Sequence, residues 1–153
     1  MANLTQAIQN MIDMCNDDSH GYDQTNRWGP DYDCSSAVIT ALQNAGFDTG
    51  SAIYTGNMSS ELCARGWERL SASVSKVAGD ILLNDADHVA MYVGNGMLAE
   101  FSSNEFGGII GGATGDQTGG EASVHAYYDY PWNCVLRWTG SISKLSLVRW
   151  IPG

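Results

Sequence analysis

Residues 33–46 read DCSSAVITALQNAG, and this stretch decides the fold. From Cys34 to Ala45 its apolar side chains recur at helical spacing, which predicts a helix with one buried face. Asp33 is an acceptable N-cap before the first turn, and Gly46 is a suitable C-cap after the last. We therefore expect a central helix that begins at Cys34 and packs in the core.

One further helix is expected on each side of this stretch. In residues 2–17 apolar side chains repeat at helical spacing while Asn, Gln and Asp fill the other face, so an amphipathic helix is predicted. A shorter helical pattern begins at Ser59 or Ser60, either of which could cap it, and runs to Arg65. Residues 16–33 are rich in Asp, Asn, Gly, Ser and Tyr, which is typical of a long structured loop.

After Gly79 the pattern changes to short apolar or alternating runs, which predict strands. Gly94-Asn95-Gly96 between two of these runs is a hairpin turn signal. Because the helices come first and a strand meander follows, the predicted fold class is α+β, with N-terminal helices packed on an antiparallel sheet of about five strands. The five runs are residues 81–83, 88–93, 97–101, 123–128 and 134–138.

The charge balance excludes several classes of partner. The chain has 153 residues, and its 7 Lys and Arg are scattered among 17 Asp and Glu, for a net charge of −10. We therefore expect neither nucleic acid nor a membrane as a partner. No apolar run is long enough to span a membrane, and the first basic residue is Arg27, so the pattern of a signal peptide is missing and synthesis in the cytoplasm is expected.

The cysteines are the strongest candidates for a chemically reactive side chain. The four cysteines form no C-x-x-C motif and have no His at the spacing of metal ligands, so we expect free thiols, no metal and no cofactor. Cys34 follows a loop and opens a helix, where the free N–H groups and the helix dipole favour a thiolate nucleophile. Its position alone is equally compatible with a small buried apolar residue.

Two later residues could complete a site with Cys34. His88 begins a predicted strand, from which it can reach a helix N-terminus, whereas His20 and His125 have no such setting. Glu100 lies in the next strand as a lone carboxylate in an apolar run, and such a group needs a partner, for which His88 is the natural candidate. Cys34, His88 and Glu100 would then act as nucleophile, base and orienter.

Three segments in this order resemble the NlpC-type cysteine peptidases: residues 32–36 (YDCSS), residues 79–94, and residues 98–103 (LAEFSS). Residues 21–36, together with 127–132 (YYDYPW), are similar to the bacteriophage peptidoglycan amidohydrolase branch, amidase family 5. The resemblance implies a papain-like fold in which the helix with the Cys packs on a sheet that carries the His. It makes residues 1–138 a catalytic domain and residues 139–153 a C-terminal extension or linker that docks on it.

The resemblance also implies roles for single residues. Cys34 would be the nucleophile and His88 the base, while Glu100 stands where the family commonly has His, Asn, Gln or Asp. Substrate binding would fall to Tyr22, Asp33 and Ser35, although Asp33 could serve only as the N-cap.

The implied activity is cleavage of an amide bond in the stem peptide of bacterial peptidoglycan, with a preference for D-glutamyl endopeptidase activity. N-acetylmuramoyl-L-alanine amidase activity is one alternative, and a non-hydrolytic wall-binding relative is another. The enzyme would be a monomer that reaches the wall after release through a holin or on a phage tail. Whether a separate cell-wall-binding module belongs with it is open.

Three other patterns allow more than one interpretation. Asp80, Asp85 and Asp87 could bind Ca²⁺ or form a solvated turn. The glycine-rich residues 107–120 resemble a phosphate loop, but no Lys follows. The aromatic residues in 127–132 could form a platform for glycan or a wall of the core and cleft.

Overall fold

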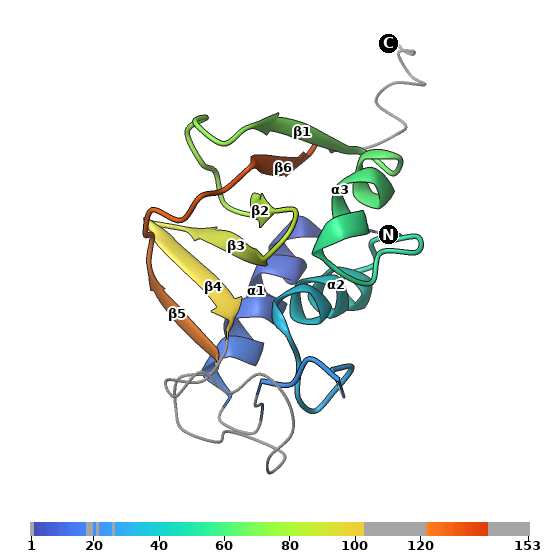
Figure 1. The fold of residues 1–153 in the computed structure, drawn as a ribbon, viewed down its shortest axis with the longest axis vertical. Coiled ribbons are helices and arrows are strands. Elements are labelled where there is room, and N and C mark those ends of the chain that lie inside the picture. Colours follow the sequence, from blue (N-terminus) through green and yellow to red (C-terminus); the bar gives the residue numbers. More distant parts are fainter. Residues whose placement is uncertain (1, 18–19, 21, 26, 103–121, 141–153) are drawn as a thin grey trace.

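The computed structural model describes residues 2–17, 20, 22–25, 27–102 and 122–140. Within these residues the chain forms three helices followed by six strands (Figure 1). The helices are α1 (Leu4–Asn16), α2 (Cys34–Asn44) and α3 (Thr55–Cys63). The strands are β1 (Trp67–Ser71), β2 (Ile81–Asn84), β3 (His88–Gly94), β4 (Met97–Phe101), β5 (Ala122–Ala126) and β6 (Cys134–Trp138). The predicted α+β class is confirmed.

Helix α2 begins and ends as its sequence predicts. The Asp33 carboxylate accepts from the Ser36 backbone N–H at 2.7 Å, and the Ser36 hydroxyl accepts from the Asp33 N–H at 3.0 Å, which together make a capping box. At the other end Gly46 has φ +88°, and its N–H donates to the Gln43 carbonyl. This double anchoring fixes Cys34 at the first position of the helix.

Two elements differ from the sequence prediction. Helix α3 begins at Thr55, four residues before Ser59, because the Asn57 side chain accepts from the backbone N–H of Tyr54 and so supports an earlier start. Strand β1 was missed because WERLS has no alternation of apolar and polar residues, and Trp67 is its one buried residue. The sheet therefore has six strands in the described residues instead of about five.

The sheet is antiparallel throughout, in the order β1-β6-β2-β3-β4-β5. The β3–β4 hairpin turns at Gly94-Asn95-Gly96, where all three residues have positive φ, as the turn signal predicts. Strand β6 lies between β1 and β2, so the last described strand is in the interior of the sheet. Strand β5 is an edge, paired only with β4 among the described strands.

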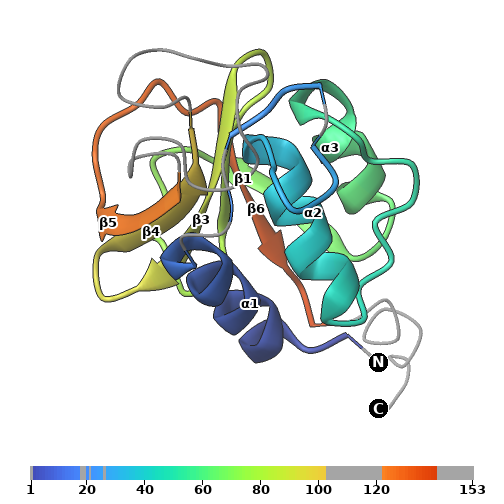
Figure 2. The same cartoon turned by 90° about the horizontal axis from the view of Figure 1, so that it is seen from below.

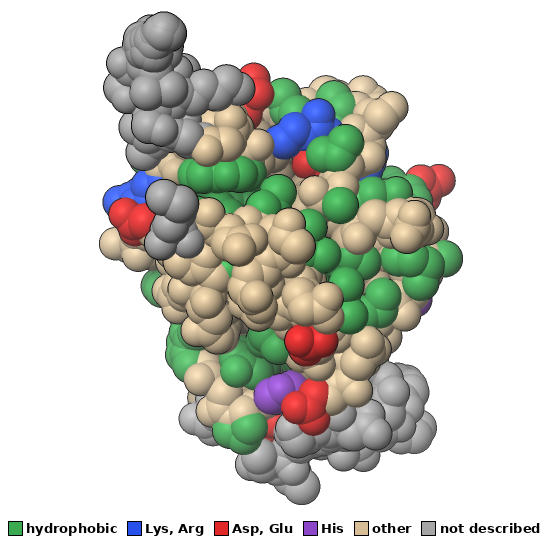
Figure 3. All heavy atoms as spheres, turned by 180° about the vertical axis from the view of Figure 1, so that it is seen from behind, with side chains coloured by type: hydrophobic (Ala, Val, Ile, Leu, Met, Phe, Trp, Pro, Cys, Tyr) green, Lys and Arg blue, Asp and Glu red, His purple; other side chains and the backbone are tan. Residues whose placement is uncertain are grey.

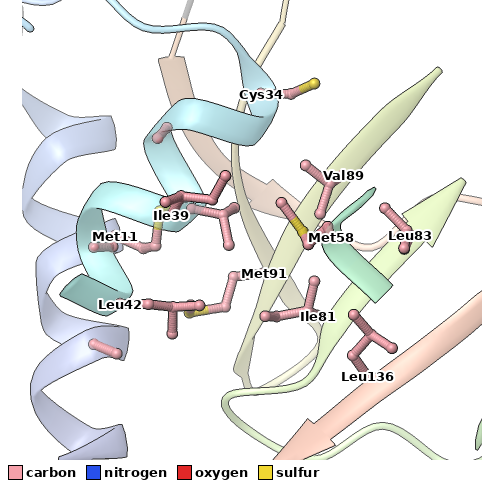
Figure 4. Close-up of a cluster of buried hydrophobic side chains, with 14 of the residues drawn as sticks. Met11, Cys34, Ile39, Leu42, Met58, Ile81, Leu83, Val89, Met91 and Leu136 are labelled. Atoms are coloured by element: carbon pink, nitrogen blue, oxygen red, sulfur yellow. The ribbon is translucent and has the colours of Figure 1, made fainter. Parts of the chain in front are cut away.

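The main core lies between the helices and one face of the sheet. Helices α1 and α2 lie side by side against this face, as the view from below shows (Figure 2). Ile39 and Leu42 of α2 pack there with Met91 of β3, and all three are fully buried (Figure 4). Burial of such a side chain contributes about 1.5–3 kcal/mol, so this core holds α2 firmly on β3.

A smaller apolar cluster covers the other face of the sheet. Leu82, Ala90, Leu98 and Val135 project from four strands and pack against Trp132, which follows β5. Alternation along β3 puts His88 on the same face as Ala90. None of the helices in the described segments has the length and apolar character that crossing a bilayer requires.

Candidate active site

Cys34 occupies the first position of α2, where backbone N–H groups have no acceptor within the helix. Its side chain lies at one end of the main apolar cluster, beyond Val89 (Figure 4). The residue is only 6% exposed. The capped start of α2 therefore places the sulfur at the margin of the core, where the fold keeps it largely shielded from water.

His88 begins β3 and is held from several sides. Its Nε2 lies 2.5 Å from Oε1 of Glu100. The Trp132 ring stacks on the imidazole with centroids 5.8 Å apart, and the Tyr130 ring meets its edge at 5.5 Å. With Nε2 bound to Glu100, the other ring nitrogen, Nδ1, is the one that remains for Cys34, which also interacts with His88.

The pKa of His88 is raised to about 9. Burial alone would lower it, but hydrogen-bonding and charge interactions with Cys34, and then with Glu100, outweigh burial. The thiol of Cys34 therefore lies close enough to His88 to affect its protonation. At neutral pH His88 carries a proton, which is the state that pairs with a cysteine thiolate.

Glu100 is 5% exposed and takes part in three hydrogen bonds from side chains. Its Oε1 accepts from His88 and from the Tyr128 hydroxyl at 3.0 Å, and its Oε2 accepts from Nε2 of His125. Burial would raise the pKa of Glu100, but these donors and the charges of the two histidines lower it. The buried carboxylate therefore stays ionised, as a partner for His88 must.

Tyr22 lies next to Cys34 and is almost fully buried. Burial, and then the nearby Cys34, raise the pKa of Tyr22 to about 12. Its hydroxyl accepts from Gln24 at 3.0 Å, which leaves the hydroxyl proton available to an acceptor.

A pocket of about 330 Å³ opens beside these residues. It is lined by Tyr22, Gln24, Asp87, His88, Ser102, Tyr128 and Tyr130. Cys34 itself does not belong to this lining. The pocket therefore presents tyrosine rings, three polar side chains that can accept hydrogen bonds and the imidazole of His88 to a ligand.

Asp33 and Ser35 are engaged with Arg27 as well as with the helix. Nη1 of Arg27 lies 3.3 Å from Oδ2 of Asp33 and 3.3 Å from the Ser35 hydroxyl, which donates to Asp33 at 3.0 Å. Asp33 caps α2 at the same time, so the N-cap role is confirmed. Their contact with substrate stays a prediction.

Two residues that bind Glu100 were not predicted as its partners. His125 lies opposite Leu98 in the β4–β5 register, two positions from Glu100 on the same face, and Tyr128 follows β5. His125 has no local pattern that marks it, since its place depends on which strand pairs with β4. Tyr128 lies in the YYDYPW segment that carried part of the family resemblance, and this was the available signal.

The aromatic segment divides between two tasks. Trp132 is buried against His88 and the second apolar cluster, and Tyr128 and Tyr130 line the pocket, so these rings form a wall of the core and cleft. Tyr127 lies apart, with the Lys76 ammonium 5.5 Å from its ring centroid. Binding of glycan by these rings is not required to explain their positions.

Two of the three acidic residues considered for Ca²⁺ are paired with arginines. Asp80 accepts from Arg137 at 2.9 and 2.8 Å, and Asp85 accepts from Arg69 at 3.1 and 2.9 Å. In the described residues no group of three or more His, Cys, Asp or Glu is arranged to hold a metal ion. The Ca²⁺ interpretation is therefore wrong, and the glycine-rich residues 107–120 lie outside the described residues.

The remaining cysteines differ from Cys34 in their surroundings. All four cysteines are free thiols. Burial raises the pKa of Cys15 to about 12 and that of Cys134 to about 11. These two thiols are therefore unreactive near neutral pH. On the face of the molecule in Figure 3, Lys and Arg form only small separate groups, in keeping with the scattered basic residues of the sequence.

A family model described as "Endolysin-like domain" matches residues 29–99 and 98–151 of this chain. The matched segments cover more than half of the sequence and include Cys34, His88 and Glu100. No curated protein gave a significant sequence match.

Several solved structures share the fold. The P60 domain of an antigen from M. avium subspecies paratuberculosis aligns with a TM-score of 0.58 and 16% identity, over 89% of this chain and 96% of that one. The peptidoglycan hydrolase RipB from Mycobacterium tuberculosis aligns at 0.59 and 18%, over 90% of this chain and 66% of RipB. Two structures of the resuscitation promoting factor interacting protein RipA also align, each over 88% of this chain and 63% of RipA. The structure mutated at a histidine has a TM-score of 0.58 and 17% identity, and the one mutated at a glutamate has a TM-score of 0.55 and 18% identity. These similarities confirm the predicted NlpC-type fold.

Proposed function

The chain belongs to the endolysin-like domain family, and we propose that it is a cysteine amidohydrolase that cleaves an amide bond in the stem peptide of bacterial peptidoglycan. The observation that carries this proposal is the buried pair of His88 and Glu100 beside the Cys34 thiol at the start of α2. A thiol, an imidazole and a carboxylate in this order are the parts that nucleophilic amide hydrolysis needs.

The proposed reaction starts with the thiolate form of Cys34. Its Sγ attacks the carbonyl carbon of the scissile amide, and the protonated His88 gives its proton to the leaving amine as the C–N bond breaks. The acyl group then remains on Cys34 as a thioester. The neutral His88 takes a proton from water, which attacks the thioester and releases the acid, so that thiolate and imidazolium are both regenerated.

Two groups near Cys34 are suited to stabilise the oxyanion of the tetrahedral intermediates. The Cys34 backbone N–H lies in the first turn of α2, at the positive end of the helix dipole. The Tyr22 hydroxyl keeps its proton at neutral pH, because its pKa is raised to about 12, and can donate it in a hydrogen bond. Donors aimed at a developing negative charge lower the barrier to attack.

Two related proteins support the proposal. RipB, which shares the fold, is described as a peptidoglycan hydrolase. The two RipA structures are mutated at a histidine and at a glutamate that are twelve residues apart, and twelve residues also separate His88 from Glu100. The same two residue types at the same separation support a pairing of His and Glu in this site.

A suspension of purified bacterial walls tests the proposed activity. We expect the protein to clear the suspension, and Cys34→Ala to lose clearing by at least a factor of about 10³, because the nucleophile is gone. Cys63→Ala is the matched control, since Cys63 is a partly buried thiol at the end of α3. A protein that sediments with walls but never clears them would instead be a non-hydrolytic wall binder.

The bond that is cut can be identified from the released fragments. We propose cleavage after D-isoglutamate, the preference that the family resemblance of the sequence implies. Mass spectrometry of digested peptidoglycan should then show new amino termini on the third residue of the stem. New amino termini on L-alanine would show an N-acetylmuramoyl-L-alanine amidase instead.

We also propose that the protein acts as a monomer and reaches the wall after release through a holin or on a phage tail. The chain spans 66% of RipB and 63% of RipA. We propose that a separate wall-binding module works with it.

A further inference from the structure

Glu100 is bound by a second histidine that the proposed reaction does not use. His125 of β5 donates from Nε2 to Oε2 of Glu100, whereas Oε1 accepts from His88 and Tyr128. The His125 side chain is 35% exposed and that of Glu100 only 6%. Cys34, His88, Glu100 and His125 thus form a row that runs from α2 across three strands and ends at the edge of the sheet.

Both ring nitrogens of His125 lie next to oxygen atoms. Its Nδ1 is 2.9 Å from the Ala126 carbonyl oxygen, and its Nε2 faces the Glu100 carboxylate. The charge of His125 is among the causes that lower the pKa of Glu100. The outer oxygen of Glu100 is therefore held both by a hydrogen bond and by a favourable charge interaction.

We propose that His125 is a positioning residue, which holds Glu100 by its outer oxygen so that the inner oxygen stays on His88. The effect of this role on turnover rests on the proposed function. The contact between His125 and Glu100 does not depend on it. Without His125, the carboxylate would lose one of its donors and a nearby positive charge. It would then rotate or take up a proton more easily, and either change weakens its bond to His88.

Few other groups can titrate in this part of the row. Within the described residues, Glu100 faces His125 from β4, and the Tyr128 ring lies 5.4 Å from it. Cys15 of α1 contacts the backbone carbonyl of Glu100. Burial raises the pKa of both Tyr128 and Cys15, so neither titrates in acid. In acid, the carboxyl carbon of Glu100 therefore reports the titration of Glu100 without a contribution from Tyr128 or Cys15.

The test is the pKa of Glu100, measured by carbon-13 NMR of its carboxyl group in the substrate-free protein. We expect His125→Ala to raise this pKa, because a donor and a positive charge are both lost. His125→Gln keeps a donor without the charge, so the rise should be smaller. Val124→Ala is the matched control: it trims the neighbouring residue of β5, which packs against the main core, and should leave the pKa unchanged.

Kinetics on soluble wall fragments give the second readout. We expect His125→Ala to lower kcat by about 10-fold with little change in KM, and His125→Gln to recover part of that loss. An unchanged Glu100 pKa in His125→Ala, or an equal shift in Val124→Ala, would overturn the proposed role. Because the titration needs no substrate, it separates this outcome from failure of the proposed function, which wall clearing by Cys34→Ala would reveal.

Discussion

Glu100 keeps its charge inside the protein because three side chains donate to it. Burial of a carboxylate without partners would drive it to take up a proton. The three donors prevent this protonation. Glu100 therefore stays an acceptor that orients His88 and stabilises its imidazolium form. The proposed chemistry of Cys34 depends on this form, since His88 must supply a proton to the leaving amine.

Substitution of Glu100 separates orientation from charge. We expect Glu100→Gln to slow wall clearing by roughly 10 to 10³-fold, because an amide can still bind the ring nitrogen of His88 but supplies no charge. Glu100→Ala should be slower still, since it removes the hydrogen bond as well. If both variants clear walls at the unmodified rate, Glu100 is structural and His88 relies on another partner.

The raised pKa of His88 predicts the shape of the pH profile. Activity should hold from neutral pH to about pH 9 and fall above it, as His88 loses the proton that the leaving amine needs. In Glu100→Gln this fall should begin at lower pH, because one of the interactions that raise the pKa of His88 is weakened. Initial rates of wall clearing across pH, in both proteins, provide the measurement.

The same two groups should make the free energy of unfolding depend on pH, His88 at the alkaline end and Glu100 at the acid end. The pKa of His88 is higher in the folded protein than its ordinary value of 6.5, so its contribution is complete below about pH 6.5 and is lost as pH rises through about 9. The pKa of Glu100 is lowered by folding, so its contribution is present above its ordinary value and is lost as pH falls through the folded value.

At the scale of elements, the start of α2 combines a structural and a chemical task. The capping box of Asp33 and Ser36 fixes where the helix begins, and the first residue after the cap is Cys34. Arg27 from the preceding loop also binds Asp33. The same carboxylate therefore sets the position of Cys34, the proposed nucleophile, and binds the loop beside it.

Two substitutions at Asp33 distinguish these tasks. Asp33→Ala should lower the free energy of unfolding by about 1 kcal/mol, because the cap is lost. Asp33→Asn should cost less than about 0.5 kcal/mol, since Asn caps nearly as well. Urea denaturation measures both values, and equal losses would show that the cap contributes little. A raised KM in the stable Asn variant would indicate that the Asp33 charge also binds substrate.

At the scale of the whole molecule, the sheet order assembles the site from distant parts of the chain. His88 begins β3, Glu100 lies on β4, and His125 lies on β5, while the return from β5 to β6 brings Tyr128 over the same face. The helices cover the opposite face, and only the N-terminus of α2 reaches the site (Figure 2).

This division explains what the sequence could predict. Cys34 and its helix were predictable because capping and helical spacing are local signals, and the pairing of His88 with Glu100 followed from one hairpin. His125 was not, because no local pattern shows that β5 pairs with β4. The predicted start of α3 was wrong, because Asn57 supports an earlier start through its contact with the backbone. Strand β1 was missed, because WERLS has no strand periodicity.

The most direct test of Cys34 as the nucleophile is alkylation with iodoacetamide at neutral pH, followed by peptide mapping and assay of wall clearing. We predict that Cys34 is labelled before Cys15, Cys63 and Cys134, and that clearing falls in proportion to the labelled fraction of Cys34. The raised pKa values of Cys15 and Cys134 keep those two thiols protonated under these conditions. Protein fully labelled at Cys34 that still clears walls at the unmodified rate would contradict the proposed mechanism.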